Sequence, residues 1–163
     1  FYAAAVHGHY AAHGLDVEII EGGSGTPTIQ VVGAGRTDFA IVSADELVIS
    51  HERGAGNVVA VFATYQTNPQ AIMAHSARGF ESLEALLRSD GALLWQAGLP
   101  YAQYLTRKYG PLKVRTAPYL GGIGNFQNDP RVSQQCFFTS EPLTARRAGL
   151  DVQTFLVADS GYN

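Results

Sequence analysis

The chain has 163 residues, close to the size of one domain, because domains mostly hold about 100 to 150 residues. Hydrophobic residues make up 46% and charged residues 15%, so the chain can bury a core and lacks the composition of a disordered protein. Its formal net charge of -3 provides no basic footprint for nucleic acid, and no apolar run approaches the ~20 residues of a membrane-spanning helix.

The first third of the chain alternates helix and strand patterns. Helices are predicted over residues 1–13, 27–34 and 43–54. Gly8 interrupts the first of these helices, and the last one begins with Ser43 and Glu46 at capping-box spacing. Apolar or alternating runs between the helices predict three strands, at residues 15–20, 38–42 and 58–62.

The same alternation continues in a second region that starts near Ala71. Strands are predicted at residues 72–74, 92–95, 113–119, 135–138 and 155–157. Helices are predicted at residues 82–87, 101–109 and 140–149. Strand-then-helix units at short spacing favour an α/β fold with a largely parallel sheet. The segment Gln66-Thr67-Asn68-Pro69 is a plausible crossing point between two lobes.

Four loops that follow strands or begin helices are candidate ligand contacts. Glycines there allow close backbone approach, and hydroxyl, amide and backbone N–H groups can meet polar ligand atoms. They are Ser24-Gly25-Thr26, Ser43-Ala44-Asp45, the turn from Gly98 to Tyr101, and Gly121-Gly122-Ile123-Gly124-Asn125. The alternative for any one of them is a strand–helix turn whose cap is already satisfied.

Aromatic residues cluster near these loops and suggest stacking on a planar ligand. They are Phe1, Tyr2, Tyr65, Trp95, Tyr101, Tyr119 and Phe126. Tyr65 and Gln66 lie just past a predicted strand at the lobe crossing, and Trp95 ends another strand. The alternative is that several of these rings fill the core, as Tyr104 and Tyr109 are expected to do.

The chain offers little for catalysis or metal binding. His7, His9 and His13 lie on a predicted helix surface with no cysteine nearby, so we expect a solvated face. Glu141 has no acid, histidine or nucleophile near it in sequence and is expected to anchor a ligand group or a helix N-terminus. The single Cys136 is expected to be a buried structural thiol. We therefore expect no catalytic residue, no metal and no cofactor.

Several short motifs resemble one known family when taken in order. They are Gly14-Leu15-Asp16-Val17-Glu18, Gly22-Gly23, Gly35-Arg36-Thr37-Asp38-Phe39-Ala40, Ser43-Ala44-Asp45, Thr139-Ser140-Glu141-Pro142, Ala148-Gly149 and Asp159-Ser160-Gly161-Tyr162-Asn163. This order resembles the NMT1/THI5-like (SsuA/ThiY-type) family, which holds periplasmic substrate-binding proteins of ABC transporters. The resemblance runs along essentially the whole chain.

The resemblance implies an α/β fold of the type II periplasmic-binding-protein class, with two three-layer lobes. Residues 1–70 would be a partial lobe 1, residues 71–158 lobe 2, and residues 159–163 the start of a return segment to lobe 1. The chain begins without a methionine, and we expect an internal segment of a longer polypeptide. The first strand would precede Phe1, and the end of the return would follow Asn163.

The function implied is capture of a small molecule between the lobes and delivery to an inner-membrane ABC permease. The protein would be a periplasmic or lipid-anchored monomer, and the aromatic residues favour a planar compound such as a thiamine pyrimidine precursor. One alternative is a pyrimidine synthase that consumes pyridoxal phosphate. Its expected lysine and histidine are replaced here by Val42 and Glu46. The other alternative is the effector domain of a transcription regulator.

Overall fold

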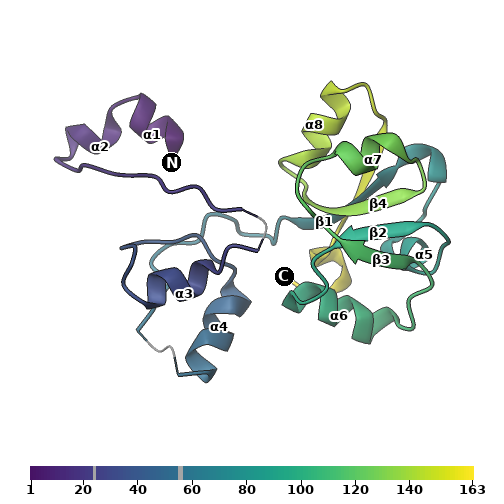
Figure 1. The fold of residues 1–163 in the computed structure, drawn as a ribbon, viewed down its shortest axis with the longest axis horizontal. Helices are drawn as coiled ribbons and strands as arrows, with labels where there is room; N and C mark the ends of the chain where they lie inside the picture. The colour runs from purple at the N-terminus through teal and green to yellow at the C-terminus, as the bar shows by residue number, and fades with distance from the viewer. Residues whose placement is uncertain (24, 55–56) are drawn as a thin grey trace.

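A mixed five-stranded sheet forms the centre of the fold in the computed structural model, which describes residues 1–23, 25–54 and 57–163 (Figure 1). The predicted α/β class is confirmed. The strands of the sheet are β1 (Gln70–His75), β2 (Ala92–Trp95), β3 (Arg115–Pro118), β4 (Val132–Phe137) and β5 (Val152–Leu156). They lie in the order β3-β2-β4-β1-β5.

The sheet is mixed and not largely parallel as predicted, because β1 runs against the other strands. Strand β2 pairs in parallel with β3 on one side and with β4 on the other. Strand β1 pairs antiparallel with both β4 and β5, so it is the strand among the described residues that runs against its neighbours. Gln70 at the start of β1 lies opposite Phe137 at the end of β4. The carboxyl ends of the parallel strands therefore lie at the edge where the chain arrives from residues 1–69.

Helices cover both faces of this sheet and give it three layers (Figure 1). On one face, α5 (Leu83–Leu87) and α6 (Pro100–Tyr109) pack against β1 and β2 through a cluster that includes Ile72 and Leu93. On the other face, α7 (Gly124–Asn128) and α8 (Glu141–Arg147) pack through a cluster that includes Met73 and Phe126. Ile72 and Met73 point to opposite faces because side chains alternate along a strand.

Residues 1–69 contain helices but no strand among the described residues. The helices are α1 (Tyr2–Val6), α2 (His9–Ala12), α3 (Thr28–Gly33) and α4 (Ala44–Glu52). Gly8 separates α1 from α2 by adopting a positive φ of 71°, a conformation that costs glycine little. The predicted capping box forms at the start of α4, where the Ser43 backbone N–H donates to Glu46 Oε2 at 3.3 Å.

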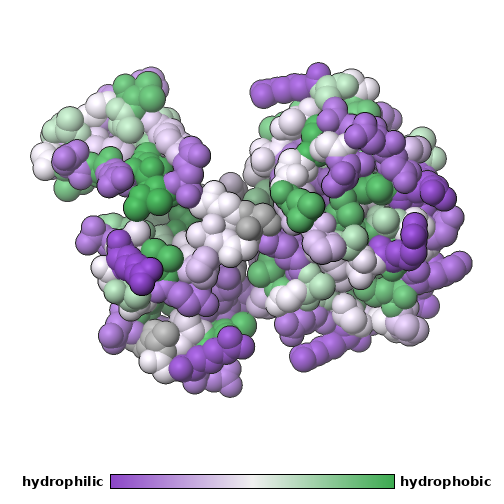
Figure 2. Space-filling view, in the orientation of Figure 1, coloured by the Kyte–Doolittle hydropathy of each residue, from purple (hydrophilic) through white to green (hydrophobic). Residues whose placement is uncertain are grey.

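The prediction of three strands within residues 1–69 is wrong. Residues 15–20, 38–42 and 58–62 have no ladder partner among the described residues. Their apolar side chains are exposed instead of buried, with 78% of Phe39 and 84% of Phe62 accessible, and Figure 2 shows hydrophobic side chains at the surface of this part. An alternating pattern specifies an extended backbone with one apolar face, but a strand also needs a hydrogen-bonded neighbour.

The last residues of the chain connect residues 1–69 to the remainder of the structure, which contains the sheet and is called the sheet part below. Short 3₁₀ turns at Ser76–Arg78 and Ala158–Ser160 flank the sheet, and the second leads into Tyr162 and Asn163. The Asn68 backbone N–H donates to Asn163 Oδ1 at 2.7 Å, and the Tyr162 hydroxyl donates to Asp45 Oδ2 on α4. In the described ranges, every helix is too short or too polar to cross a membrane.

Both hydrophobic clusters lie in the sheet part, so stability should depend on that part. We expect Leu93→Ala, which truncates a fully buried side chain in β2, to lower the free energy of unfolding by about 2–5 kcal/mol. The matched change Val61→Ala removes a side chain that is 72% exposed and should stay within about 0.5 kcal/mol of the parent. Urea denaturation measures both, and equal losses would contradict this division.

Candidate functional site

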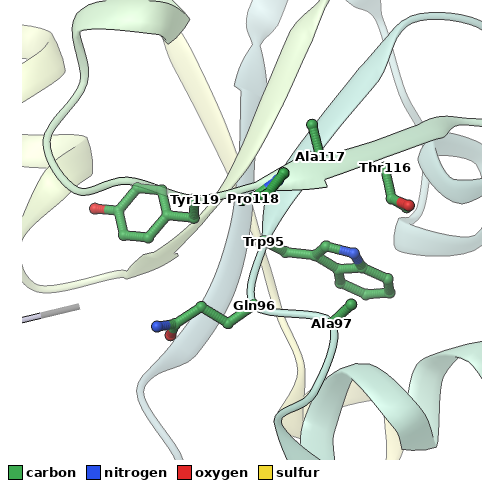
Figure 3. Close-up of a pocket in the computed structure, with 7 residues that line it drawn as sticks. All are labelled: Trp95, Gln96, Ala97, Thr116, Ala117, Pro118 and Tyr119. Carbon is green, nitrogen blue, oxygen red and sulfur yellow. The ribbon is translucent and has the colours of Figure 1, made fainter. Parts of the chain in front are cut away.

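An open pocket of about 250 Å³ lies at the carboxyl ends of β2 and β3 (Figure 3). The residues that line it end these strands or follow them directly: Trp95, Gln96, Ala97, Thr116, Ala117, Pro118 and Tyr119. Trp95 and Pro118 are the last paired residues of the two strands, and the Tyr119 backbone N–H donates to the Trp95 carbonyl at 3.3 Å. Ligands of open α/β sheets bind at this edge.

Strand order explains why a hollow forms at this edge. Helix α6 leads from β2 to β3 on one side, whereas α8 leads from β4 past β1 to β5 on the other. The two connections cover opposite faces and diverge between β2 and β4. Ligands of open α/β sheets commonly bind outside the carboxyl ends of the strands at such a divergence. The pocket lies at the neighbouring strands β2 and β3.

The side chain of Gln135 on β4 fixes the turn that follows β2. Its Oε1 accepts from the Gln96 backbone N–H at 2.6 Å and from the Tyr101 hydroxyl at 2.7 Å. Its Nε2 donates to Gln96 Oε1 at 3.1 Å. Gln135 is buried, so these bonds join β4, the turn and α6 in a region where unpaired polar groups would be costly. The Gln96 wall of the pocket is therefore held in one position.

A second pair of side chains holds the other wall. The Tyr119 hydroxyl donates to Glu141 Oε1 at 2.9 Å, and Glu141 Oε2 accepts from the Phe137 backbone N–H at 2.9 Å. Burial, and then the neighbouring Glu141 carboxylate, raise the pKa of Tyr119 above the ordinary value for a phenol. Both carboxylate oxygens of Glu141 are thus engaged within the protein, and its predicted role in anchoring a ligand group stays a prediction.

Trp95 belongs both to the core and to the pocket. Its side chain is 3% exposed, and its ring meets that of Tyr101 edge to face, with 6.2 Å between centroids and 76° between planes. Its indole Nε1–H has no hydrogen-bond partner in the part of the chain that the structure describes. Trp95 thus packs like a core residue and is also one of the residues that line the pocket (Figure 3).

Some of the other predicted residues lie at the same edge of the sheet. The Gly122 carbonyl accepts from Gln134 Nε2 at 2.9 Å, which attaches its loop to β4. Asn125 lies exposed on α7, a helix that sequence patterns did not predict. Phe126 from the same helix is fully buried, so it fills the core as the alternative interpretation expected.

The predicted residues of the first part do not line this pocket. Phe1, Tyr2, Tyr65 and Gln66 are exposed, and Tyr2 donates to Glu21. Ser43 serves the capping box, and Asp45 accepts from Tyr162. Gly25 adopts a positive φ of 84°, and Thr26 Oγ1 accepts from the Gly23 N–H at 2.7 Å. Ser24 lies outside the described residues. Their role in binding stays a prediction.

Sequence reasoning missed Gln96 and Gln135. A signal for Gln135 was present, because the polar residues Ser133, Gln134 and Gln135 lie between the apolar Val132 and Cys136-Phe137, and buried polar residues need partners. Nothing in the sequence indicated which partners these would be. Gln96 follows Trp95 directly but carries no motif of its own.

The histidines and the cysteine, which could bind a metal or act as a nucleophile, do not line the pocket. His7, His9 and His13 are exposed, and no set of three potential metal ligands gathers within residues 1–23, 25–54 and 57–163. Cys136 is buried in β4, as predicted, and its burial, followed by Glu141, raises the pKa of the thiol. A protonated, inaccessible thiol is a poor nucleophile.

Comparison with protein-family models identifies the family that this chain matches. The family model described as NMT1/THI5 like matches residues 1–87. No curated protein matches the chain.

Stability should fall at high pH because three phenols are held protonated. Burial is the main cause that raises the pKa of Tyr101, Tyr119 and Tyr162 above about 10, and burial also raises that of the Cys136 thiol. The folded state therefore binds protons more tightly than the unfolded state, and its stability is lost as pH rises above about 9 to 10. We expect the free energy of unfolding, measured by urea denaturation, to decline as pH rises above about 9 to 10. The decline should be less steep in Tyr119→Phe than in the parent, because the variant lacks one of these phenols. An identical slope in the variant would contradict the assignment.

Proposed function

The chain belongs to the NMT1/THI5-like family, and from that membership we propose that it is the solute-binding component of an ABC importer. The family holds mostly binding proteins together with THI5-type synthases. In the proposed role the protein captures a small molecule outside the cytoplasm, as a periplasmic or lipid-anchored monomer, and passes it to an inner-membrane permease. It makes and breaks no bond.

The observation that carries this proposal is the composition of the pocket at the carboxyl ends of β2 and β3. None of its lining residues is charged, and most of them are apolar or aromatic: Trp95, Ala97, Ala117, Pro118 and Tyr119. Such a surface binds through apolar contact, with a few polar groups to orient the ligand. The rigid walls fit a binding role, because Gln135 and Glu141 fix both sides before any ligand arrives.

The same lining supports a neutral, planar ligand over an anion. A sulfonate or nitrate would need a cation beside it, since an unpaired charge is costly to remove from water. Arg115 begins β3 and so lies at the opposite end of that strand from the pocket. We therefore favour a heteroaromatic compound such as a thiamine pyrimidine precursor.

Closure of two parts around the ligand would complete the site. Residues 1–69 are joined to the sheet part through the segment ending at Pro69 and through the contacts of Tyr162 and Asn163. Rotation about these connections would bring Tyr65 and Gln66 against the pocket. A ligand favours the closed form because only that form makes both sets of contacts.

The synthase alternative requires pyridoxal phosphate, and the residues present do not fit it. Val42 offers no amine where the resemblance would place a lysine, and Glu46 is engaged in the capping box. The chain has lysines at positions 108 and 113 alone. Lys108 donates to the Ser160 carbonyl and lies over the rings of Tyr104 and Tyr109, away from the pocket lining.

A thermal-shift titration tests the binding role. We expect 4-amino-5-hydroxymethyl-2-methylpyrimidine, at 100 times its dissociation constant, to stabilise the fold by about 2.7 kcal/mol and to raise the melting temperature by about 5 to 10 °C. Taurine should leave it unchanged. Gln96→Ala should weaken the pyrimidine about tenfold, whereas Glu81→Gln, outside the pocket, should not. A shift with taurine alone would contradict the proposed ligand class.

Addition of pyridoxal phosphate tests the alternative. We expect no imine absorbance near the visible range with the native protein, because no amine is placed at the pocket. Lys108→Arg and Lys113→Arg, made singly, identify the lysine that any imine comes from. A stable imine that one of these changes abolishes, together with consumption of the cofactor by the native protein, would overturn the binding role.

A further inference from the structure

We propose that the free edge of β5 docks an extended segment of another protein, which carries lysine or arginine side chains and adds to the sheet as a further strand. In the order β3-β2-β4-β1-β5, this edge lies on the opposite side of the sheet from β3 and its pocket. The proposal therefore concerns a second surface, and it does not depend on the proposed solute-binding role.

Alternate residues of β5 direct their backbone groups away from the sheet. Strands β1 and β5 form an antiparallel ladder, in which every second residue bonds to the neighbouring strand. Asp151 and Val157 form such bonds at the two ends of this ladder. The odd-numbered residues between them share this direction, so the N–H and C=O groups of residues 152, 154 and 156 point outward.

Most of these outward groups are unpaired. The Val152 carbonyl accepts from Arg146 Nη2 at 3.4 Å, which agrees with the outward direction of this set. The backbone N–H and C=O groups of Thr154 and Leu156 have no hydrogen-bond partner among the residues that the structure describes. An open strand edge of this kind is a template for pairing with another extended chain.

Thr154 and Leu156 also line a groove of about 310 Å³ beside this edge. Its apolar surface includes Leu83 of α5, which is buried, and Phe155, which is half-buried. Tyr109 at the end of α6 lines it as well. Strand addition takes its affinity from main-chain bonds and its specificity from pockets for alternate side chains. The edge and the groove together supply both requirements.

Charge determines which segment fits. Three lining residues are exposed carboxylates and no lining residue is a cation: Glu81, Glu84 and Asp159. Glu84 pairs with Arg88 at 2.9 Å, whereas the other two have no ion pair within residues 1–23, 25–54 and 57–163. Lys108 lies nearby, but the Ser160 carbonyl accepts from it. A second copy that met this edge with its own would bring like charges together, which disfavours a dimer and favours a basic partner.

Peptide binding tests the proposal on the unmodified protein. The probe is a capped peptide of about ten residues in which lysine alternates with valine, so that the lysine stems cover the groove while the ammonium groups reach the carboxylates. The control peptide has glutamate in place of lysine. We expect titration calorimetry to show at least tenfold tighter binding of the lysine peptide. Equal binding of the two peptides would overturn the assignment of a basic partner.

N-methylation of the lysine peptide separates strand addition from simple charge attraction. Methyl groups are placed on alternate backbone nitrogens, in one peptide on the lysines and in the other on the valines. Only one of these sets faces β5 in an added strand, so one peptide should lose about tenfold or more in affinity and the other should keep it. Equal affinities of the two methylated peptides would overturn strand addition.

Substitutions in the protein supply the matching test. Thr154→Pro removes an outward N–H at a position where an edge strand tolerates proline, and it should weaken the lysine peptide about tenfold. Thr154→Ala keeps the N–H and should bind like the parent. Glu81→Gln combined with Asp159→Asn should weaken binding and reduce its dependence on salt. Unchanged affinity in Thr154→Pro would overturn the proposal; if that variant fails to fold, the methylated peptides on the parent decide.

Sedimentation equilibrium tests the competing occupant. We expect the parent to remain a monomer at the concentrations used for the peptide titrations. A dimer that Thr154→Pro dissociates, and that Thr154→Ala does not, would show that a second copy occupies this edge and would overturn the proposed partner. Each of these outcomes leaves the pocket at β2 and β3 unaffected, because no residue lines both surfaces.

Discussion

The buried amide of Gln135 determines the shape of the pocket more than any other group. It joins β4 to the turn after β2 and to the first turn of α6, three segments that no backbone ladder connects at this point. Without its Oε1, the Gln96 N–H and the Tyr101 hydroxyl would both lose their acceptor, at about 1–3 kcal/mol each for buried groups. The turn would then be free to move, and the wall formed by Gln96 with it. Apolar packing supplies the stability of the sheet part, but a polar contact fixes the position of the pocket wall.

Sequence patterns predicted the sheet part well because local and long-range requirements agree there. Residues 92–95 and 72–74 carry short apolar runs, and each finds neighbours on both sides in the sheet. The N-cap at Ser82 and the proline that begins α6 act within a single turn of helix, so their positions could be inferred from spacing alone. Where a segment with the sequence pattern of a strand also finds neighbouring strands to pair with, the predicted strand forms.

The first part shows the opposite case. Residues 38–42 have the composition of a buried strand, yet Phe39 and Ile41 are exposed because no neighbour pairs with this segment in the described structure. The candidate site is intermediate between these cases. Trp95 and Tyr119, which line the pocket, were among the predicted residues because aromatic residues at or just after strand ends are recognisable in a sequence. Gln135 and its partners were not, because a contact between positions 96 and 135 depends on β2 and β4 being neighbours, and no local signal records that adjacency.

The segment that links residues 1–69 to the sheet part is held more firmly on the sheet side. Tyr162 packs against Tyr104 of α6, with 5.0 Å between ring centroids, while its hydroxyl reaches Asp45 of α4. Lys108 and Tyr104 both donate to the Ser160 carbonyl, so the segment before Tyr162 is held firmly on the sheet side. On the other side the attachment includes the bond from Tyr162 to Asp45 and the bond from the Asn68 N–H to Asn163. In the closure that we propose, residues 1–69 would pivot about Asp45 and Asn68, while Gln135 and Glu141 keep the pocket walls unchanged. A ligand bound first at the pocket would then contact residues 1–69 only on closure, the order of events expected of the proposed binding role.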